Sequence, residues 1–151
     1  MGTSLRKPDL DELPALSQLC LRSKSYWGYD ADFMKACEDE LTLHKDALDH
    51  PIVLADTPSG IAGVAQLMHE DADMDLALLY VDPAHMGRGI GQVLFDWCVT
   101  TGQSMQADRL LIEADPNAAA FYEHMGAKLI GNAPSGSIPG RRLPLLALDL
   151  R

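Results

Sequence analysis

The spacing of apolar and polar positions divides the chain into segments with two different periods. Apolar residues recur every three to four positions over residues 9–24 and 30–41, which predicts two amphipathic helices near the N-terminus. Residues 51–56, 60–69 and 74–81 are short apolar runs that predict strands. The stretch "TPSG" separates the first two runs and is typical of a hairpin turn.

The second half of the chain alternates between the two periods. Residues 91–106 have helical spacing, and residues 109–114 form a continuous apolar run that predicts a buried strand. Residues 115–125 open with Asp-Pro, a combination typical of a helix start, and end before a glycine. Two final apolar runs, residues 127–132 and 143–150, flank a turn-rich stretch and predict two more strands.

This order of elements predicts the fold class. With a short first strand over residues 3–7, the chain reads strand, two helices, three strands, helix, strand, helix and two strands. The helix between residues 74–81 and 109–114 predicts a right-handed parallel crossover within a largely antiparallel sheet. We therefore expect one α/β domain over residues 1–151. In such sheets, ligands favour the carboxyl end of the strand that precedes the crossover helix.

Composition narrows the classes of partner. The 151 residues include 22 acidic and 12 basic side chains, a formal net charge of -10, which disfavours an electrostatically driven nucleic-acid binder. No segment approaches the roughly 18 to 20 apolar residues of a membrane span, and the N-terminus lacks an apolar signal core. The three cysteines are far apart and lack metal-ligand spacing. We expect a reduced, cytoplasmic protein without a metal site or a membrane partner.

A glycine-rich loop lies where this topology predicts a ligand. In "PAHMGRGIGQVL", Gly87, Gly89 and Gly91 alternate with Arg88 and Ile90 between an apolar strand and a helix. A helix N-terminus leaves backbone N–H groups free for anions, and glycines allow a phosphate to approach them. Arg88 would add a positive charge. Because neither the Walker nor the Rossmann spacing is present, the residues alone leave two interpretations, a pyrophosphate site and a turn without a ligand.

Two segments resemble the GNAT superfamily of acyl-CoA-dependent N-acyltransferases. "LYVDPAHMGRGIGQVL" resembles its motif A, in which Arg or Gln is followed by two residues, Gly, any residue and Gly or Ala; Met86 occupies the first position and is a departure. "DPNAAAFYEHMGA" is similar to the family's Asn-x-x-Ala-x-x-Phe-Tyr-x-x-x-Gly signature, with Asp115 in place of the asparagine. The resemblance implies a GNAT-like sheet whose parallel central strand pair is splayed around an acyl-CoA site, and acetyl-CoA as the cofactor.

The resemblance also implies which residues hold the cofactor. The backbone of the glycine loop would bind the pyrophosphate, and the strand before it would present backbone groups to the pantetheine arm. The expected cofactor-binding residues are Leu79, Tyr80, Val81, Met86, Gly87, Arg88, Gly89, Ile90, Gly91, Gln92, Val93, Asp115, Asn117 and Tyr122. Asp115 has a second interpretation, as the N-cap of the helix that follows it.

Tyr122 is the candidate general acid. Its phenol, with an ordinary pKa of about 10, can protonate a departing thiolate whose thiol titrates at about 8.5; packing beside Phe121 is the other interpretation. An amine must lose a proton before it attacks, so a base is also required. Asp75, six residues before Val81, is the first candidate base and Glu113 the second. Asp75 can equally be a charged residue at a strand start.

The turn "SKSYWGYDADF" contains a candidate acceptor wall. Trp27 and Tyr29 could face the acceptor as an apolar or cation-binding surface, or could staple the two N-terminal helices together. We expect an N-acetyltransferase that moves an acetyl or other acyl group from coenzyme A to a primary amine of a small molecule or peptide, by direct attack in a ternary complex. The rival is a catalytically inactive acyl-CoA sensor or scaffold. The acceptor, the acyl-chain length and the oligomeric state, including a possible homodimer, stay open.

Overall fold

A computed structural model describes residues 2–151, and its order of strands and α-helices is the predicted one. The strands are β1 Ser4–Arg6, β2 Ile52–Thr57, β3 Gly60–Glu70, β4 Asp73–Val81, β5 Arg109–Glu113, β6 Lys128–Pro134 and β7 Arg142–Asp149. The α-helices are α1 Leu13–Ser25, α2 Ala31–Leu41, α3 Ile90–Ser104 and α4 Ala119–His124. Short 3-10 helices that periodicity did not reveal are η1 Leu10–Glu12, η2 Lys45–Asp49 and η3 Pro83–His85. Among the described residues, no helix is both long and apolar enough to cross a membrane.

The N-terminal helices follow the predicted pattern with one correction. Asp30 is the N-cap of α2, because its carboxylate accepts a hydrogen bond from the Phe33 amide at 2.8 Å. The first helix begins later than predicted, with a 3-10 turn before Leu13 and Pro14 in the first helical turn. As a result Leu10 is exposed and does not belong to the buried face of this helix.

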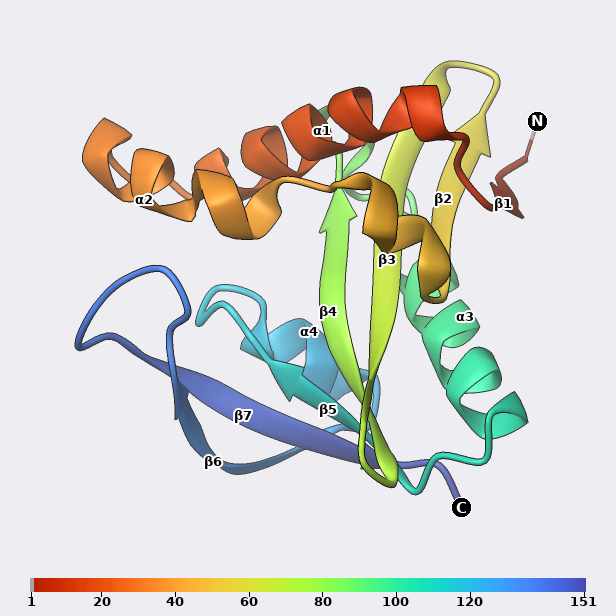
Figure 1. Ribbon diagram of the computed structural model, residues 1–151, viewed down its shortest axis with the longest axis vertical. Coiled ribbons are helices and arrows are strands. Elements are labelled where there is room, and N and C mark those ends of the chain that lie inside the picture. The colour runs from red at the N-terminus through yellow and green to blue at the C-terminus, as the bar shows by residue number, and fades with distance from the viewer. Residues whose placement is uncertain (1) are drawn as a thin grey trace.

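Residues 2–151 form one seven-stranded sheet in the order β1-β2-β3-β4-β5-β7-β6 (Figure 1). Every neighbouring pair is antiparallel except β4 and β5, which are parallel and are connected through α3. This confirms the expected mixed sheet with a parallel central pair. The glycine loop is therefore at the carboxyl end of β4, where the crossover begins.

The two parallel strands separate soon after they meet. Met74 pairs with Leu110 and Asp75 pairs with Leu111, and no further pair joins β4 to β5 within the described chain. Figure 1 shows the strands diverging, with β4 running upward and β5 running to the left beside β7. β4 stays paired with β3 as far as Val81, so its other edge presents backbone N–H and C=O groups without a strand partner. Such groups need a partner when water is excluded, which makes this edge available to a ligand.

A β-bulge places Ala77 in the middle of β4. Opposite it on β3, Gln66 pairs with Leu78 and Leu67 pairs with Leu76, so Ala77 is an extra residue. Residues two apart on a regular strand share a face, but Leu76 packs in the core under α3 while Leu78 packs in the core under α1. The bulge therefore reverses the side-chain alternation within the segment that borders the split.

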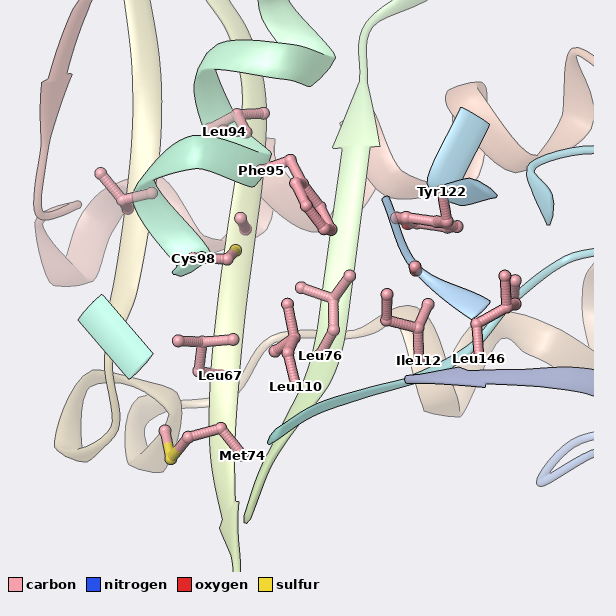
Figure 2. Packing of buried hydrophobic residues seen from close by; sticks show 14 of the residues in the cluster. Leu67, Met74, Leu76, Leu94, Phe95, Cys98, Leu110, Ile112, Tyr122 and Leu146 are labelled. Atoms are coloured by element: carbon pink, nitrogen blue, oxygen red, sulfur yellow. The ribbon is translucent and has the colours of Figure 1, made fainter. Parts of the chain in front are cut away.

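Two apolar clusters hold the helices on opposite faces of the sheet. Figure 2 shows the first, in which Leu94, Phe95 and Cys98 of α3 and Tyr122 of α4 pack with Leu67, Met74, Leu76, Leu110, Ile112 and Leu146. The second joins α1 and α2 to the other face through Leu16, Leu19, Cys20, Cys37, Leu41, Leu54, Val64 and Leu78. Each fully buried leucine contributes about 2 kcal/mol, so both helix layers are firmly attached around the split.

Candidate active site

A hollow with a volume of about 400 Å³, which we call the loop cavity, contains most of the residues expected to bind the cofactor. It lies between the end of α1, the end of β4, the glycine loop and α4. The residues expected to bind the cofactor that line it are Leu79, Tyr80, Val81, Met86, Gly87, Gly89, Ile90, Gly91, Gln92, Asp115, Asn117 and Tyr122. The fold therefore brings together the two segments that carry the family resemblance, although residues 95–114 separate them in the chain.

Two of the expected cofactor residues are not part of the loop cavity wall. Arg88 lines a neighbouring hollow with Pro58 and Ser59 of the turn between β2 and β3, and this hollow shares His85 and Ile90 with the loop cavity. Val93 is part of α3, where its amide donates to the Gly89 carbonyl at 3.1 Å and is not free for a pyrophosphate. For Arg88 and Val93, contact with the cofactor stays a prediction.

The glycine loop presents free backbone amides at the start of α3. Gly87 and Gly89 have φ values of 79° and 78°, in the left-handed region that side chains disfavour. Gly89 is the N-cap of α3 and no side chain caps this helix. Within residues 2–151, the amides of residues 87–92 have no hydrogen-bond partner in the protein. These free donors, at the positive end of a 15-residue helix, fit a pyrophosphate without help from Met86.

The space between the separated strands forms a second, narrower hollow, the split cavity, of about 70 Å³. It is lined by the residues of β4 and β5 beyond their last pair and by α4. It shares Leu79, Tyr80, Asp115, Ala118 and Tyr122 with the loop cavity, so the two are continuous. The free edge of β4 borders this passage, where its backbone groups match the amide groups of a pantetheine arm.

Tyr122 lies where the loop cavity meets the split cavity. Its ring packs against Phe121 at a centroid distance of 5.2 Å and against Phe95 at 5.8 Å, and Figure 2 shows it above Ile112 and Leu146. Burial, with smaller effects from Cys98 and Asp115, raises the pKa of its phenol far above the ordinary value. The phenol is thus protonated at neutral pH and can act as a hydrogen-bond and proton donor.

The two candidate bases line different hollows. Asp75 lines a third hollow, the acidic cavity, of about 360 Å³, formed by the end of α2, η2, β3 and β4. Burial, followed by the charges of Glu113 and Glu70, raises the pKa of Asp75 to about 6. Glu113 lines the split cavity. Ala77, at the bulge, lines both the acidic cavity and the split cavity, which makes them neighbours.

Asp115 is not the N-cap of α4. The helix begins at Ala119, and the Asp115 carboxylate instead accepts from the Asn117 amide at 2.8 Å. It also binds Lys24 Nζ at 2.5 Å and the Tyr29 hydroxyl at 2.8 Å. Burial would raise the pKa of Asp115, but the hydrogen bonds from Lys24, the Asn117 amide and Tyr29 outweigh it and hold the pKa below its usual range. The acid that replaces the family's asparagine is therefore part of a buried ion pair.

The two aromatic residues of the N-terminal turn have different surroundings. Trp27 is half exposed and lines the loop cavity. Tyr29 stacks on Phe33 at a centroid distance of 4.0 Å, and its hydroxyl accepts from Arg141 at 3.0 Å and from Asn117 Nδ2 at 3.1 Å. Trp27 therefore borders the candidate cofactor site, whereas Tyr29 staples the turn to its neighbours.

A further hollow of about 80 Å³, the polar cavity, contains residues that sequence reasoning missed. Lys24 lies on the buried stripe of α1, four residues after Cys20, and a lysine on an apolar stripe is itself a signal of a buried acidic partner. Arg141, in the turn-rich stretch before β7, contacts the Phe33 ring at 4.8 Å and lines the polar cavity with Glu40. Nothing in its local sequence indicates this contact.

His85 is another residue that the sequence did not single out. It is buried beside the loop cavity, and its Nδ1 is the one buried side-chain nitrogen or oxygen of residues 2–151 that lacks a hydrogen-bond partner. Over the same described residues, no three His, Cys, Asp or Glu side chains gather in an arrangement that could hold a metal ion.

Comparison with known proteins bears directly on this geometry. A family model described as an acetyltransferase (GNAT) domain matches residues 48–126, just over half of the chain, including the split strands and the glycine loop. The curated proteins yielded no match.

Solved structures show the same fold at low identity. The GCN5-related N-acetyltransferase from Rhodopseudomonas palustris has a TM-score of 0.82 and 20% identity, covering 99% of this chain and 96% of that one. The PaiA N-acetyltransferase from Thermoplasma acidophilum, in complex with coenzyme A, has a TM-score of 0.78 and 16% identity, covering 99% of both chains. The YncA protein of Salmonella typhimurium, with its cofactor acetyl-CoA, has a TM-score of 0.70 and 17% identity, covering 100% and 95%. With a glycine loop that fits a pyrophosphate and a family model matched across it, this chain belongs to the GNAT acetyltransferase family.

Proposed function

We propose that this protein transfers an acetyl group from acetyl-CoA to a primary amine by direct attack in a ternary complex. One observation carries the proposal: the loop, split and acidic cavities adjoin one another through shared wall residues. A proton donor, Tyr122, lies at one junction, and a carboxylate, Asp75, lies in the cavity beyond the other. This arrangement gives two reactants separate entrances to one meeting point, which is the geometry that a ternary mechanism requires.

The residues present fit the cofactor. The free amides of residues 87–92 would hold its pyrophosphate, and the open edge of β4 at Leu79, Tyr80 and Val81 would bind the pantetheine amides. Acetyl-CoA, when bound, supplies a thioester that an amine can attack. The PaiA structure with coenzyme A and the YncA structure with acetyl-CoA support this choice of cofactor for a chain of the same fold.

Asp75 is the proposed base. An alkylamine with a pKa of about 10.4 is neutral in only a few parts per ten thousand at pH 7, so its proton must be taken up. With a pKa of about 6, Asp75 is ionised at pH 7 to 8 and still basic enough to accept a proton. Glu113 ranks second, because it lies on the exposed surface of β5.

Tyr122 is the proposed acid. Its hydroxyl keeps its proton at neutral pH and lies on the wall between the loop and split cavities, where a departing thiolate would need one. The three cysteines, Cys20, Cys37 and Cys98, are buried and unpaired, so none serves as an acyl carrier in this proposal. Their unpaired state also fits the cytoplasmic setting expected from the sequence.

The test combines turnover and binding. Purified protein is incubated with acetyl-CoA and a panel of amines, thiol release is followed with a thiol-reactive dye, and coenzyme A binding is measured by calorimetry. Amine-dependent thiol release supports the proposal. Binding without thiol release from any amine would instead favour the inactive acyl-CoA sensor, and absence of binding would reject both functions.

A further inference from the structure

The acidic cavity holds more negative charge than one amine requires. Its wall includes Glu40, Asp46 and Asp75, and because the Glu40 carboxylate already accepts a hydrogen bond from the Ser137 hydroxyl, Asp46 and Asp75 are the acids free to bind a cation. Among residues 2–151, none of the three forms an ion pair with a lysine or arginine. Lys24 and Arg141, which line the adjoining polar cavity, are both directed to Asp115. Asp46 and Asp75 therefore have no ion-pair partner among the described residues, while only one of them is needed as a base.

Gln66 adds a hydrogen-bond acceptor to the wall of the acidic cavity. This residue of β3 is 94% buried, since only 6% of its surface is exposed, and it lines the acidic cavity. Its Nε2 donates to the Ala47 carbonyl at 2.9 Å, and because a carbonyl can only accept, the amide orientation is fixed with Oε1 on the other side. Oε1 has no hydrogen-bond partner among residues 2–151, and it is not fully buried, so it must reach an open surface. That surface is the cavity that Gln66 lines, where Oε1 is free to accept a hydrogen bond.

The remaining polar side chains of the cavity are consistent with a cationic ligand. Thr42 uses its hydroxyl hydrogen for the Glu38 carbonyl at 2.6 Å, so it offers the cavity an acceptor. His44 and His50 also line the cavity, and each neutral imidazole keeps one acceptor nitrogen.

We propose that the acceptor is a diamine or polyamine, whose reacting amine approaches Asp75 and whose second ammonium group binds Asp46 and Gln66 in the acidic cavity. This inference rests on the acetyl transfer proposed above and adds the class of the acceptor. The cavity wall at Ala77 adjoins the split cavity, so an alkyl chain can join the two amino groups across the bulge. A ligand with a single ammonium group would leave Asp46 without a partner. A ligand that carries a carboxylate would be repelled by Asp46.

Three acceptors of matched length test the charge requirement. These are 1-aminobutane, 4-aminobutanoate and 1,4-diaminobutane, assayed with acetyl-CoA at pH 8. We expect kcat/KM for the diamine to exceed that for the monoamine by at least about tenfold, the usual effect of a charge-assisted hydrogen bond, and the amino acid to react most slowly. Added salt should reduce the advantage of the diamine because it screens the ion pairs. Equal rates for the diamine and the monoamine would overturn the inference while leaving acetyl transfer intact.

A pair of matched variants locates the second ammonium group. Asp46 and Asp49 both belong to η2 and are both exposed, but only Asp46 lines the acidic cavity. Asp46→Asn should raise KM for 1,4-diaminobutane several-fold and shrink its advantage over 1-aminobutane, whereas Asp49→Asn should leave the ratio unchanged. An equal loss in both variants would indicate a general effect of net charge and would reject the site. Retention of the full ratio in Asp46→Asn would reject it as well.

Two further measurements separate this inference from the proposed function. If no amine releases thiol, calorimetry with 1,4-diaminobutane in the presence of coenzyme A still tests the site, and binding that Asp46→Asn weakens would support it. Absence of such binding would overturn it. Spermidine and a short lysine-containing peptide then distinguish a free polyamine from a basic peptide, and preference for the peptide would reject the small-molecule class proposed.

Discussion

The hydroxyl of Tyr29 donates a hydrogen bond to the carboxylate of Asp115 at 2.8 Å, and so joins the turn after α1 to the turn before α4. Lys24 binds the same carboxylate oxygen at 2.5 Å, and Arg141 approaches it at 3.9 Å. Three segments that are distant in sequence thus meet at one buried acid beside the split. Asp115 stands where the family signature has asparagine, and its charge is matched by a lysine that a neutral amide would leave unpaired.

Asp115→Asn should therefore destabilise the protein even though it restores the family residue. Lys24, nine-tenths buried, would lose its counter-charge, and breaking such a pair costs about 3 kcal/mol. Urea unfolding at pH 7 measures this change. The double variant Lys24→Met with Asp115→Asn removes both charges and should cost less than the sum of the two single changes. Additive costs would show that the ion pair is not coupled.

Acid should weaken the same contact. Because the pKa of Asp115 is lowered in the folded protein, the unfolded chain binds more protons as the pH falls through the ordinary value of about 3.9. The contribution of Asp115 is fully present above that pH and is lost as the pH falls through its lower, folded-state pKa. Unfolding free energies measured between pH 6 and pH 3 should fall less steeply in Asp115→Asn than in the wild type. Parallel curves would contradict this linkage.

Asp75 should show the opposite linkage. Its pKa of about 6 lies above the ordinary value, so the folded protein binds more protons than the unfolded chain between pH 4 and pH 6 and becomes less stable as the pH rises. Asp75→Asn removes the buried charge. The variant should match the wild type at pH 4 and be more stable at pH 8 by about 1 to 2 kcal/mol, since Asp75 is only partly buried. A loss of stability at pH 8 would contradict the shifted pKa.

The same substitution tests the proposed base. In the wild type, kcat/KM should rise with pH through about 6 as Asp75 loses its proton. Asp75→Asn should lower kcat about a hundredfold and remove this limb of the profile, while calorimetry shows unchanged acetyl-CoA affinity. Glu113→Gln is the matched comparison, because it tests the second carboxylate. Loss of the limb in Glu113→Gln and not in Asp75→Asn would exchange the two roles.

Local patterns predicted the order of the elements, but they did not predict the separation of β4 from β5. Helical and strand periods are properties of neighbouring residues, so the boundaries of α2, β3 and α3 were readable within a few positions. The split depends on the bulge at Ala77 and on pairing that ends at Asp75, and neither feature changes the apolar run "MDLALLYV". The resemblance to a family supplied the splayed pair that the residues alone did not.

The candidate site also has parts that the sequence predicted and parts that it did not. The glycine loop was predictable because its conformation is encoded in consecutive residues, Gly87 to Gly91. Its limits were not, because the first turn of α3 uses the Val93 amide. The acidic cavity could not be predicted from the sequence, because tertiary packing brings its walls together from the end of α2, η2, β3 and β4. The alternative interpretation of Asp115 as a helix cap was wrong, and its ion pair was not predictable because its partner Lys24 is 91 residues away.

The two glycines at the start of α3 should tolerate alanine differently. Gly89 has a φ of 78°, where an alanine costs about 1 to 2 kcal/mol and shifts the amides of the loop, so Gly89→Ala should lower both stability and coenzyme A affinity. Gly91 is helical, and a Cβ there would meet the Phe121 ring at 3.4 Å, a contact that a small movement relieves. Gly91→Ala should therefore fold normally and retain most of the affinity. Thermal unfolding and calorimetry compare the two, and equal affinity losses would show that space near Phe121, and not backbone conformation, limits the loop.

Tyr122→Phe should separate chemistry from binding. The phenylalanine keeps the packing against Phe95 and Phe121, and no protein group among residues 2–151 hydrogen-bonds to the hydroxyl, so stability should change by less than about 1 kcal/mol. Loss of the proton donor should lower kcat about a hundredfold and leave the Kd for acetyl-CoA unchanged. Tyr26→Phe removes the same group from an exposed tyrosine and serves as the control. A parallel loss of turnover and affinity in Tyr122→Phe would assign the hydroxyl to cofactor binding and would require a different proton donor at the junction of the two cavities.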